Sequence, residues 1–139
     1  MENFRLQIPT DIRFGINRLA ELPEVLEPLG KRVLLAYGGG SIKKSGLYDK
    51  VTQILKENGF DWVELAGIEP NPRIESVREG AKLIHENQLD VILAVGGGSV
   101  VDASKVIAAA AYYDGDAWDL VKDSNLIGQA VPIVDILTL

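Results

Sequence analysis

The chain has 139 residues, of which 47% are hydrophobic and 24% charged, a composition typical of one globular domain large enough to bury a core. Its net charge of −6 argues against a nucleic-acid partner, because a phosphate backbone requires clustered lysines and arginines and the basic residues here are scattered. The lack of cysteine and the single histidine, His85, exclude disulfides and Cys- or His-rich metal sites, and without a visible leader or long apolar span we expect a cytoplasmic protein with no membrane partner.

The first part of the sequence predicts a framing segment, a helix and a buried strand. Residues 6–14 contain two short apolar stretches broken by a proline, which predicts short N-terminal edge strands or one bent strand. Asn17 stands where it would cap the following helix, and Pro23 predicts a kink or a restart in that helix. Residues 33–37 are a continuous apolar run, as expected of a strand buried on both faces.

Helices and strands then alternate. Apolar spacing predicts helices at residues 45–58 and 73–87, and apolar runs predict strands at residues 60–65 and 91–95. The two prolines within residues 67–72 require a loop. This alternation predicts an α/β fold, with a Rossmann-like parallel sheet flanked by helices and joined by right-handed crossovers.

The last part of the sequence predicts a long helix, a short helix and a final strand. The long helix would open at Ser99 and run through the alanines to Ala111, and the short one would cover residues 118–122. Residues 131–139 are apolar and predict a strand. Because an apolar strand ends the sequence without a polar exit, we expect the chain to be the first part of a longer protein.

A strand, a glycine-rich turn and a helix occur together twice. Residues 33–42 (VLLAYGGGSI) echo residues 91–100 (VILAVGGGSV), and we name residues 38–41 the first glycine turn and residues 96–99 the second. Glycines allow a ligand to approach the backbone N–H groups closely, and the start of a helix favours a phosphate. Two such turns at the carboxyl ends of parallel strands would line one nucleotide crevice. The alternative is a pair of tight turns that open capped helices and bind nothing.

The second turn departs from the common nucleotide fingerprints. Val101 stands where G-x-G-x-x-G has its last glycine, and the sequence holds no G-x-x-x-x-G-K-[ST]. Ser99 and Asp102 have the spacing of a capping box. Asp102 therefore either caps the helix or, because a pyrophosphate would repel it, points to a hydroxyl or an amide.

The first turn bears on the choice of cofactor. Lys43 and Lys44 follow it, and no acid lies between Lys31 and Asp49. An acid at such a place accepts hydrogen bonds from a ribose 2′-hydroxyl, whereas small residues with a nearby cation accommodate a 2′-phosphate. The pattern favours NADP(H) over NAD(H), unless both lysines only form a solvated helix start.

Six stretches taken together are more specific than either turn. In chain order they read IPTDIRFG, YGGGSIKKSGLYD, GIEPNPR, LAVGGGSVVDASKVIAA, YYDGDAWDLV and VPIVDILTL. This combination resembles the iron-dependent alcohol dehydrogenase family, especially its butanol dehydrogenase and aldehyde reductase branch. The resemblance implies a dehydroquinate synthase-like N-terminal domain over residues 1–139 that holds the nicotinamide cofactor.

The resemblance also assigns roles to individual residues. Gly97, Gly98 and Ser99 would contact the pyrophosphate, with Asp102 near the nicotinamide. The first turn would hold the adenosine ribose and its 2′-phosphate. Thr138 and Leu139 match the start of a further segment that contacts the cofactor. The residues implied at the first turn are Gly39, Gly40, Ser41 and Lys43.

The resemblance implies that the oxidoreductase chemistry needs more than this chain. In the family, a helical C-terminal domain carries the iron or zinc ligands, so this chain alone is expected to be inactive and to hold no metal. A homodimer through the N-terminal strands is expected. Two alternatives stay open, a stand-alone nucleotide-binding module without catalysis and a domain of a glycerol dehydrogenase-like enzyme. Asp135 departs from the small apolar residue usual in its strand, so we expect it to be partnered or on an exposed face.

Overall fold

The computed structural model of the chain describes residues 3, 5, 8–71 and 73–138. Within them, four strands form one sheet in the order β2-β1-β3-β4, and each pair of neighbours is parallel. This confirms the predicted α/β architecture. The strands are β1 (Arg32–Tyr37), β2 (Asp61–Leu65), β3 (Val91–Gly96) and β4 (Ile133–Leu137).

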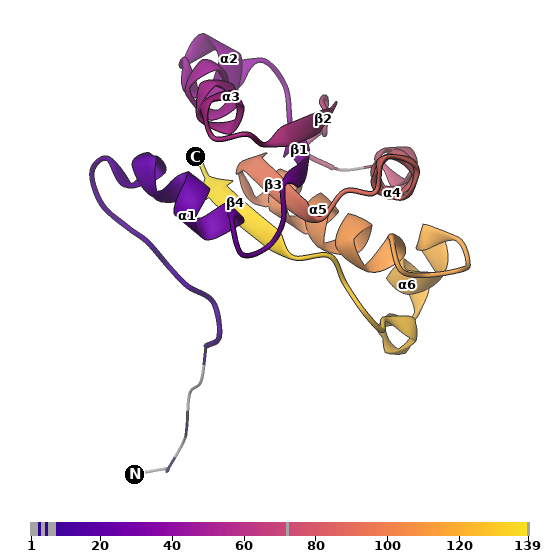
Figure 1. The fold of residues 1–139 in the computed structure, drawn as a ribbon. Helices are drawn as coiled ribbons and strands as arrows, with labels where there is room; N and C mark the ends of the chain where they lie inside the picture. The colour runs from indigo at the N-terminus through magenta and orange to yellow at the C-terminus, as the bar shows by residue number, and fades with distance from the viewer. Residues whose placement is uncertain (1–2, 4, 6–7, 72, 139) are drawn as a thin grey trace.

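Helices cover both faces of the sheet (Figure 1). One face packs against α1 (Leu22–Leu26), α2 (Ser41–Lys44) and α3 (Leu47–Glu57), preceded by the 3-10 turn η1 (Arg18–Glu21). The other face packs against α4 (Ile74–Asn87), α5 (Gly98–Ala110) and α6 (Ala117–Lys122), followed by η2 (Ser124–Leu126). The sheet is therefore the middle layer of three.

The central strands β1 and β3 are buried on both faces. Leu34 and Ile92 face α4 and α5, whereas Leu35 and Leu93 face α1 and α3, and all four side chains are at most 1% exposed. A strand with both faces covered has no reason to alternate polar and apolar residues, which explains its continuous apolar sequence. The two glycine turns leave the carboxyl ends of these two strands.

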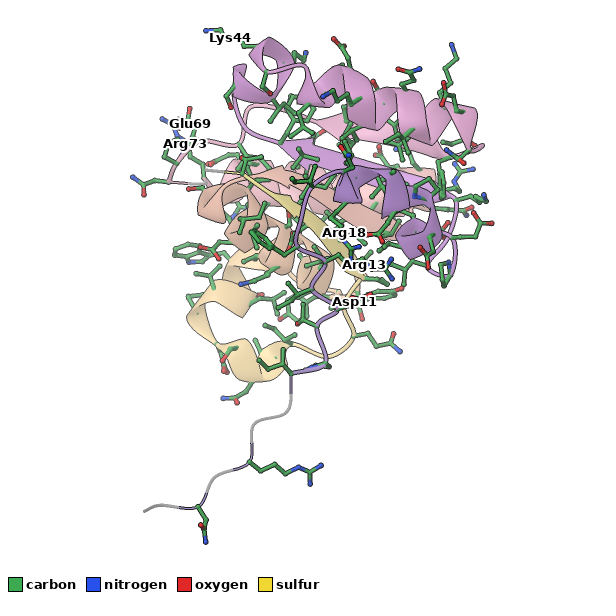
Figure 2. The ribbon with its side chains drawn as sticks, turned by 90° about the vertical axis from the view of Figure 1, so that its left-hand side faces the viewer. Asp11, Arg13, Arg18, Lys44, Glu69 and Arg73 are labelled. Carbon is green, nitrogen blue, oxygen red and sulfur yellow. The ribbon has the colours of Figure 1, made fainter. Side chains whose placement is uncertain are left out.

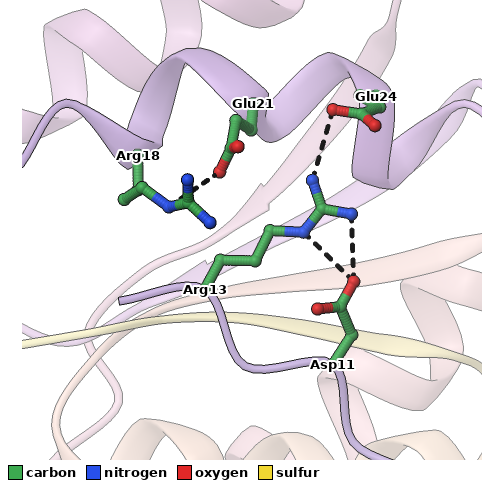
Figure 3. Close-up of polar contacts among 5 residues, drawn as sticks. All are labelled: Asp11, Arg13, Arg18, Glu21 and Glu24. Atoms are coloured by element: carbon green, nitrogen blue, oxygen red, sulfur yellow. Dashed lines mark hydrogen bonds and ion pairs between the residues drawn. The ribbon is translucent and has the colours of Figure 1, made fainter. Parts of the chain in front are cut away.

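The predicted N-terminal edge strands are wrong over the residues that the structure describes. Residues 8–14 form no strand, and residues 6 and 7 lie outside the description. The segment passes outside the sheet on the side of α1 and joins none of its strands (Figure 1). Pro9 lacks the N–H group that a sheet ladder needs. The segment is instead tied to α1 by Arg13, whose guanidinium lies 3.0 Å from Asp11 and 3.2 Å from Glu24 (Figure 3).

Two helix starts also differ from the prediction. Asn17 has a left-handed backbone (φ 61°), its side chain makes no capping hydrogen bond, and the turn that follows it is a short 3-10 helix. Pro23 lies in the first turn of α1, which confirms the predicted restart. Backbone N–H groups in the first turn of a helix have no acceptor within the helix, so a proline there removes no hydrogen bond. The helix predicted at 45–58 is preceded by the separate short helix α2, and Gly46 (φ +81°) stands between them.

Gly80 sets the distance between α4 and α5. A Cβ at this position would lie 2.7 Å from Cδ1 and 2.9 Å from Cγ1 of Ile107. We expect Gly80→Ala to destabilise the fold by about 1–3 kcal/mol, because overpacking outweighs the preference of a helix for alanine, about 1 kcal/mol. Urea unfolding measures the difference. Ile107→Val in the same chain should restore part of the loss, and a Gly80→Ala protein as stable as the wild type would contradict this assignment.

Candidate cofactor site

The two glycine turns lie side by side. Their strands β1 and β3 are neighbours, with Tyr37 opposite Val95 in the ladder. The Thr138 amide then donates a hydrogen bond of 2.9 Å to the Gly96 carbonyl, which places the chain beyond β4 next to the second turn. Three successive strands of the sheet therefore end at one edge, where open α/β sheets bind their ligands.

A hollow of about 150 Å³ opens at this edge, lined by Ser41, Ile42, Ser45 and Thr138. The fold thus brings together Ser41 and Thr138, two predicted site residues that lie at opposite parts of the sequence. Leu139, which was predicted beside Thr138, lies outside the described residues.

Two glycines at the turns are required by the packing of the chain itself. A Cβ on Gly38 would lie 3.0 Å from the carbonyl oxygen of Ile68. A Cβ on Gly96 would lie 2.7 Å from Cγ2 of Val100, and Gly96 has a φ of +158°. At these two positions a side chain has no room.

At three other glycines of the two turns, the packing of the chain does not require glycine. A Cβ on Gly39, Gly40 or Gly98 would meet no atom within 4 Å, and none of the three has a left-handed φ. On Gly97 a Cβ would make only an ordinary contact, 3.7 Å from the Thr138 carbonyl. Because neither backbone strain nor packing requires glycine at 39, 40 and 98, the bare backbone there is available for the close approach of a ligand.

The start of α5 leaves backbone donors free. The amides of Val100 and Val101 donate to the Gly97 carbonyl at 3.1 and 3.3 Å. The amides of Gly98 and Ser99 donate to no acceptor among the described residues. Two free N–H groups at the positive end of a 13-residue helix suit an anionic ligand.

The predicted capping box at Ser99 is wrong. The helix begins one residue earlier, at Gly98, and its first turn has no side-chain cap. The Ser99 hydroxyl instead donates a hydrogen bond of 2.7 Å to the Pro70 carbonyl. Asp102 is exposed and forms an ion pair of 3.6 Å with Lys105. Only the backbone amide of Ser99 is left for a ligand.

The loop after β2 joins the two turns, a link that no sequence pattern revealed. Its Gly67 amide donates to the Gly38 carbonyl of the first turn (2.9 Å), and its Pro70 carbonyl accepts from Ser99 of the second (2.7 Å). At the rim of this loop, Glu69 and Arg73 form an exposed ion pair of 3.4 Å (Figure 2). The loop thereby ties both turns to a common support.

Asp102 does not line the hollow that holds Ser41 and Thr138. It lies at a separate groove of about 180 Å³ between α4, α5 and α6, together with Trp118 and mainly apolar neighbours. Asp135 is exposed on the edge strand β4, one of the two arrangements expected for it. Partial burial raises the pKa of its carboxyl, and Lys105 opposes that shift.

Lys43 and Lys44 have different surroundings. The Lys43 ammonium lies 4.9 Å from the centre of the Tyr48 ring and 5.6 Å from that of Tyr37. Lys44 extends outward into solvent (Figure 2). The Tyr37 hydroxyl donates to Oε1 of Glu64 (3.0 Å), a contact between β1 and β2 that the sequence reading did not identify.

The same carboxylate raises the pKa of Tyr48 to about 12, first by hydrogen bonding and then with the help of burial. A raised pKa means that the fold favours the neutral phenol, so its stabilising effect is complete below the unfolded value of about 10. We expect this effect to disappear as the pH rises from there to about 12. A tyrosinate absorbance titration tests the shift, and Glu64→Gln should lower the transition of Tyr48.

The comparison with protein families decides the classification. Residues 9–139 match the family model described as iron-containing alcohol dehydrogenase. The chain belongs to this family.

Similar members of the iron-containing alcohol dehydrogenase family are longer than this chain. The chain is 52% identical to NADH-dependent butanol dehydrogenase A of Clostridium acetobutylicum and 46% identical to the NADPH-dependent aldehyde reductase YqhD of Escherichia coli. In both cases the match covers 100% of this chain and 36% of the relative. The chain therefore spans about a third of their length.

Solved structures agree in fold. The crystal structure of an NADH-dependent butanol dehydrogenase A from Thermotoga maritima matches with a TM-score of 0.93 and 44% identity, over 100% of this chain and 35% of that one. The cofactor-free aldehyde reductase from E. coli matches with a TM-score of 0.89 and 46% identity, over 99% and 36%. The parallel sheet with its two helical layers is thus the N-terminal fold of these enzymes.

The part of this family member that the structure describes contains no group of three or more His, Cys, Asp or Glu side chains able to hold a metal ion. The metal that the family name implies does not fit the described residues. Over the same residues, no helix has the length and apolar character needed to span a bilayer.

Proposed function

We propose that this chain binds the nicotinamide dinucleotide of a metal-dependent alcohol dehydrogenase or aldehyde reductase. The observation that carries the proposal is the bare backbone at Gly39, Gly40 and Gly98, which the packing of the chain does not require. These glycines flank an edge where free amides and a hollow meet. A ligand with a phosphate and a sugar would use all three features.

The proposed binding assigns a task to each turn. The amides of Gly98 and Ser99 donate to the pyrophosphate, and Gly97 lets it approach. Gly39, Gly40 and Ser41 of the first turn receive the adenosine ribose, and Thr138 borders the cofactor from the end of β4. Leu139 is assigned to the cofactor by the family resemblance alone. Asp102 is assigned to the nicotinamide end by the family resemblance alone, because the described fold places it at a different groove.

When bound, the reduced cofactor would donate a hydride to an aldehyde, and the oxidised cofactor would accept one from a primary alcohol, in the whole enzyme. What this chain contributes is binding and orientation. The loop of Gly67 and Pro70 is hydrogen-bonded to both turns at 2.9 and 2.7 Å, so the pyrophosphate and the adenosine ribose would meet a common rigid support.

NADP(H) is the preferred cofactor in this proposal. Lys43 and Ser41 stand at the first turn without an acid between Lys31 and Asp49, an arrangement that suits a 2′-phosphate. The names of the relatives divide on this point, since the C. acetobutylicum enzyme is called NADH-dependent and the E. coli enzyme NADPH-dependent. The preference of this chain therefore has to be measured directly.

Titration of the purified chain with NADPH and with NADH tests the proposal. The emission of the bound cofactor and that of Trp62 and Trp118 report binding. We expect saturable binding of both cofactors, with the lower Kd for NADPH. Binding of neither would contradict the cofactor role, and tighter binding of NADH would contradict the preference.

We also propose that two copies associate through the N-terminal segment. Ile12, Phe14 and Ile16 alternate along it and are 75%, 96% and 91% exposed, which is a strand-like apolar face that no described residue covers. Sedimentation equilibrium should show a dimer, and Phe14→Ser with Ile16→Ser should shift it toward monomer while the fold stays intact. A wild-type chain that remains monomeric at every concentration would contradict the dimer.

A further inference from the structure

Resting on the cofactor role proposed above, we infer that Tyr37, Tyr48 and Glu64 form a positioning cluster that holds the Lys43 ammonium ready for the 2′-phosphate of NADP(H). The cluster joins β1, α3 and β2 at the base of the first glycine turn. These three residues are thereby determinants of cofactor preference that act through Lys43 and do not themselves contact the cofactor.

The geometry of the cluster is well defined. The two tyrosine rings meet edge to face, with their centres 5.7 Å apart and an angle of 63° between their planes. Tyr37 is only 4% exposed, so its ring is a fixed support. Lys43 lies within cation–π distance of both rings, at 4.9 and 5.6 Å. A flexible side chain on the surface is thereby confined to one region.

Glu64 holds the Tyr37 phenol and acts on the Tyr48 phenol as well. It accepts a hydrogen bond from the Tyr37 hydroxyl at 3.0 Å, and it raises the pKa of the Tyr48 phenol to about 12. A phenol that donates to a carboxylate has a more electron-rich ring, which attracts a cation more strongly. The carboxylate already accepts from the Tyr37 hydroxyl, so it is less available as an acceptor for a ribose hydroxyl.

The charge of Lys43 stays available for an anion. Among the described residues Lys43 forms no ion pair with a carboxylate. Lys31 is a useful contrast: it also lies over an aromatic ring, 4.3 Å from the centre of Phe60, but its ammonium is paired with Glu27. Aromatic faces position a cation without neutralising it, which is what a phosphate-binding lysine needs.

The position along the chain fits this role. Lys43 stands two residues after Ser41, which lines the hollow at the carboxyl edge of the sheet. Tyr37 is the last residue of β1, directly before the turn. The cluster thus lies between the strand from which the turn departs and the lysine that follows the turn.

The test is the ratio of the Kd values for NADH and NADPH, measured for four variants. Lys43→Met should lower the ratio about tenfold by weakening NADPH alone, whereas Lys44→Met, its matched control, should leave it unchanged. Tyr48→Leu removes the ring and should lower the ratio about two- to fivefold, the size of an exposed cation–π contact. Tyr48→Phe keeps the ring and should retain most of the preference.

A purely structural cluster would give a different result, because a distorted turn weakens both cofactors and leaves the ratio unchanged. In a chain that already carries Lys43→Met, Tyr48→Leu should have no further effect on the ratio. If leucine loosens the fold, Tyr48→Gln replaces it, because glutamine favours a helix and also lacks the ring.

The outcomes separate the inference from the function on which it rests. A wild-type chain that binds neither cofactor contradicts the proposed function. A chain that binds both, but keeps its ratio when Tyr48 loses its ring, overturns the positioning role and leaves the cofactor site intact. A ratio that is unchanged by Lys43→Met overturns it as well.

Discussion

Replacing Gly98 by alanine should weaken the binding of NADPH and of NADH by at least about tenfold, equivalent to about 1.4 kcal/mol, without destabilising the fold. A methyl group at this position meets no atom of the chain within 4 Å, so it occupies the space through which the pyrophosphate would approach. Alanine also lowers the entropy of the unfolded chain and favours the helix, together worth up to about 1 kcal/mol. Cofactor titration and thermal unfolding measure the two effects separately.

Gly96→Ala is the matched control for this variant. Its Cβ would lie 2.7 Å from Val100 at a φ of +158°, so it should destabilise the fold by about 1–3 kcal/mol. The two variants distinguish a glycine that is needed for ligand binding from one that is needed for the packing of the chain. If Gly98→Ala binds both cofactors as tightly as the wild type, the second turn does not hold the pyrophosphate.

Replacing Ser41 by aspartate should remove the preference for NADPH. A carboxylate at the first turn would repel the 2′-phosphate, and at an exposed, salt-screened site we expect a loss of about 1–2 kcal/mol, or roughly 5- to 30-fold in Kd. NADH should bind at least as well as before, because its 2′-hydroxyl can donate to the new carboxylate. Ser41 is exposed at the start of α2, so the fold should tolerate the change.

Asn125→Asp serves as the charge control for Ser41→Asp. It adds the same negative charge at an exposed position in η2, which follows α6 on the other face of the sheet. It should leave both Kd values unchanged. An equal loss in both aspartate variants would show a general effect of net charge, and an unchanged ratio in Ser41→Asp would place the 2′-phosphate elsewhere.

The sequence carried much of the fold because the relevant signals are local. A continuous apolar run such as Val91 to Val95 identifies a strand covered on both sides, and its alternation with helices identifies a parallel sheet. The errors occurred where a local pattern met a tertiary constraint. Residues 8–14 have the apolar stretches of a strand but find no partner in the sheet, and Ser99 has the spacing of a cap but donates to Pro70 instead.

By itself, the sequence determined the architecture, the family resemblance and the two turns, because repeats, periodicity and glycine clusters are local patterns of consecutive residues. Only the tertiary structure decided which turn glycines the packing requires, since that depends on atoms such as those of Ile68 and Val100. It alone brought Ser41 to Thr138 and placed Lys43 over two tyrosine rings held by Glu64. Contacts between separate strands are set by their order in the sheet, which no local pattern records.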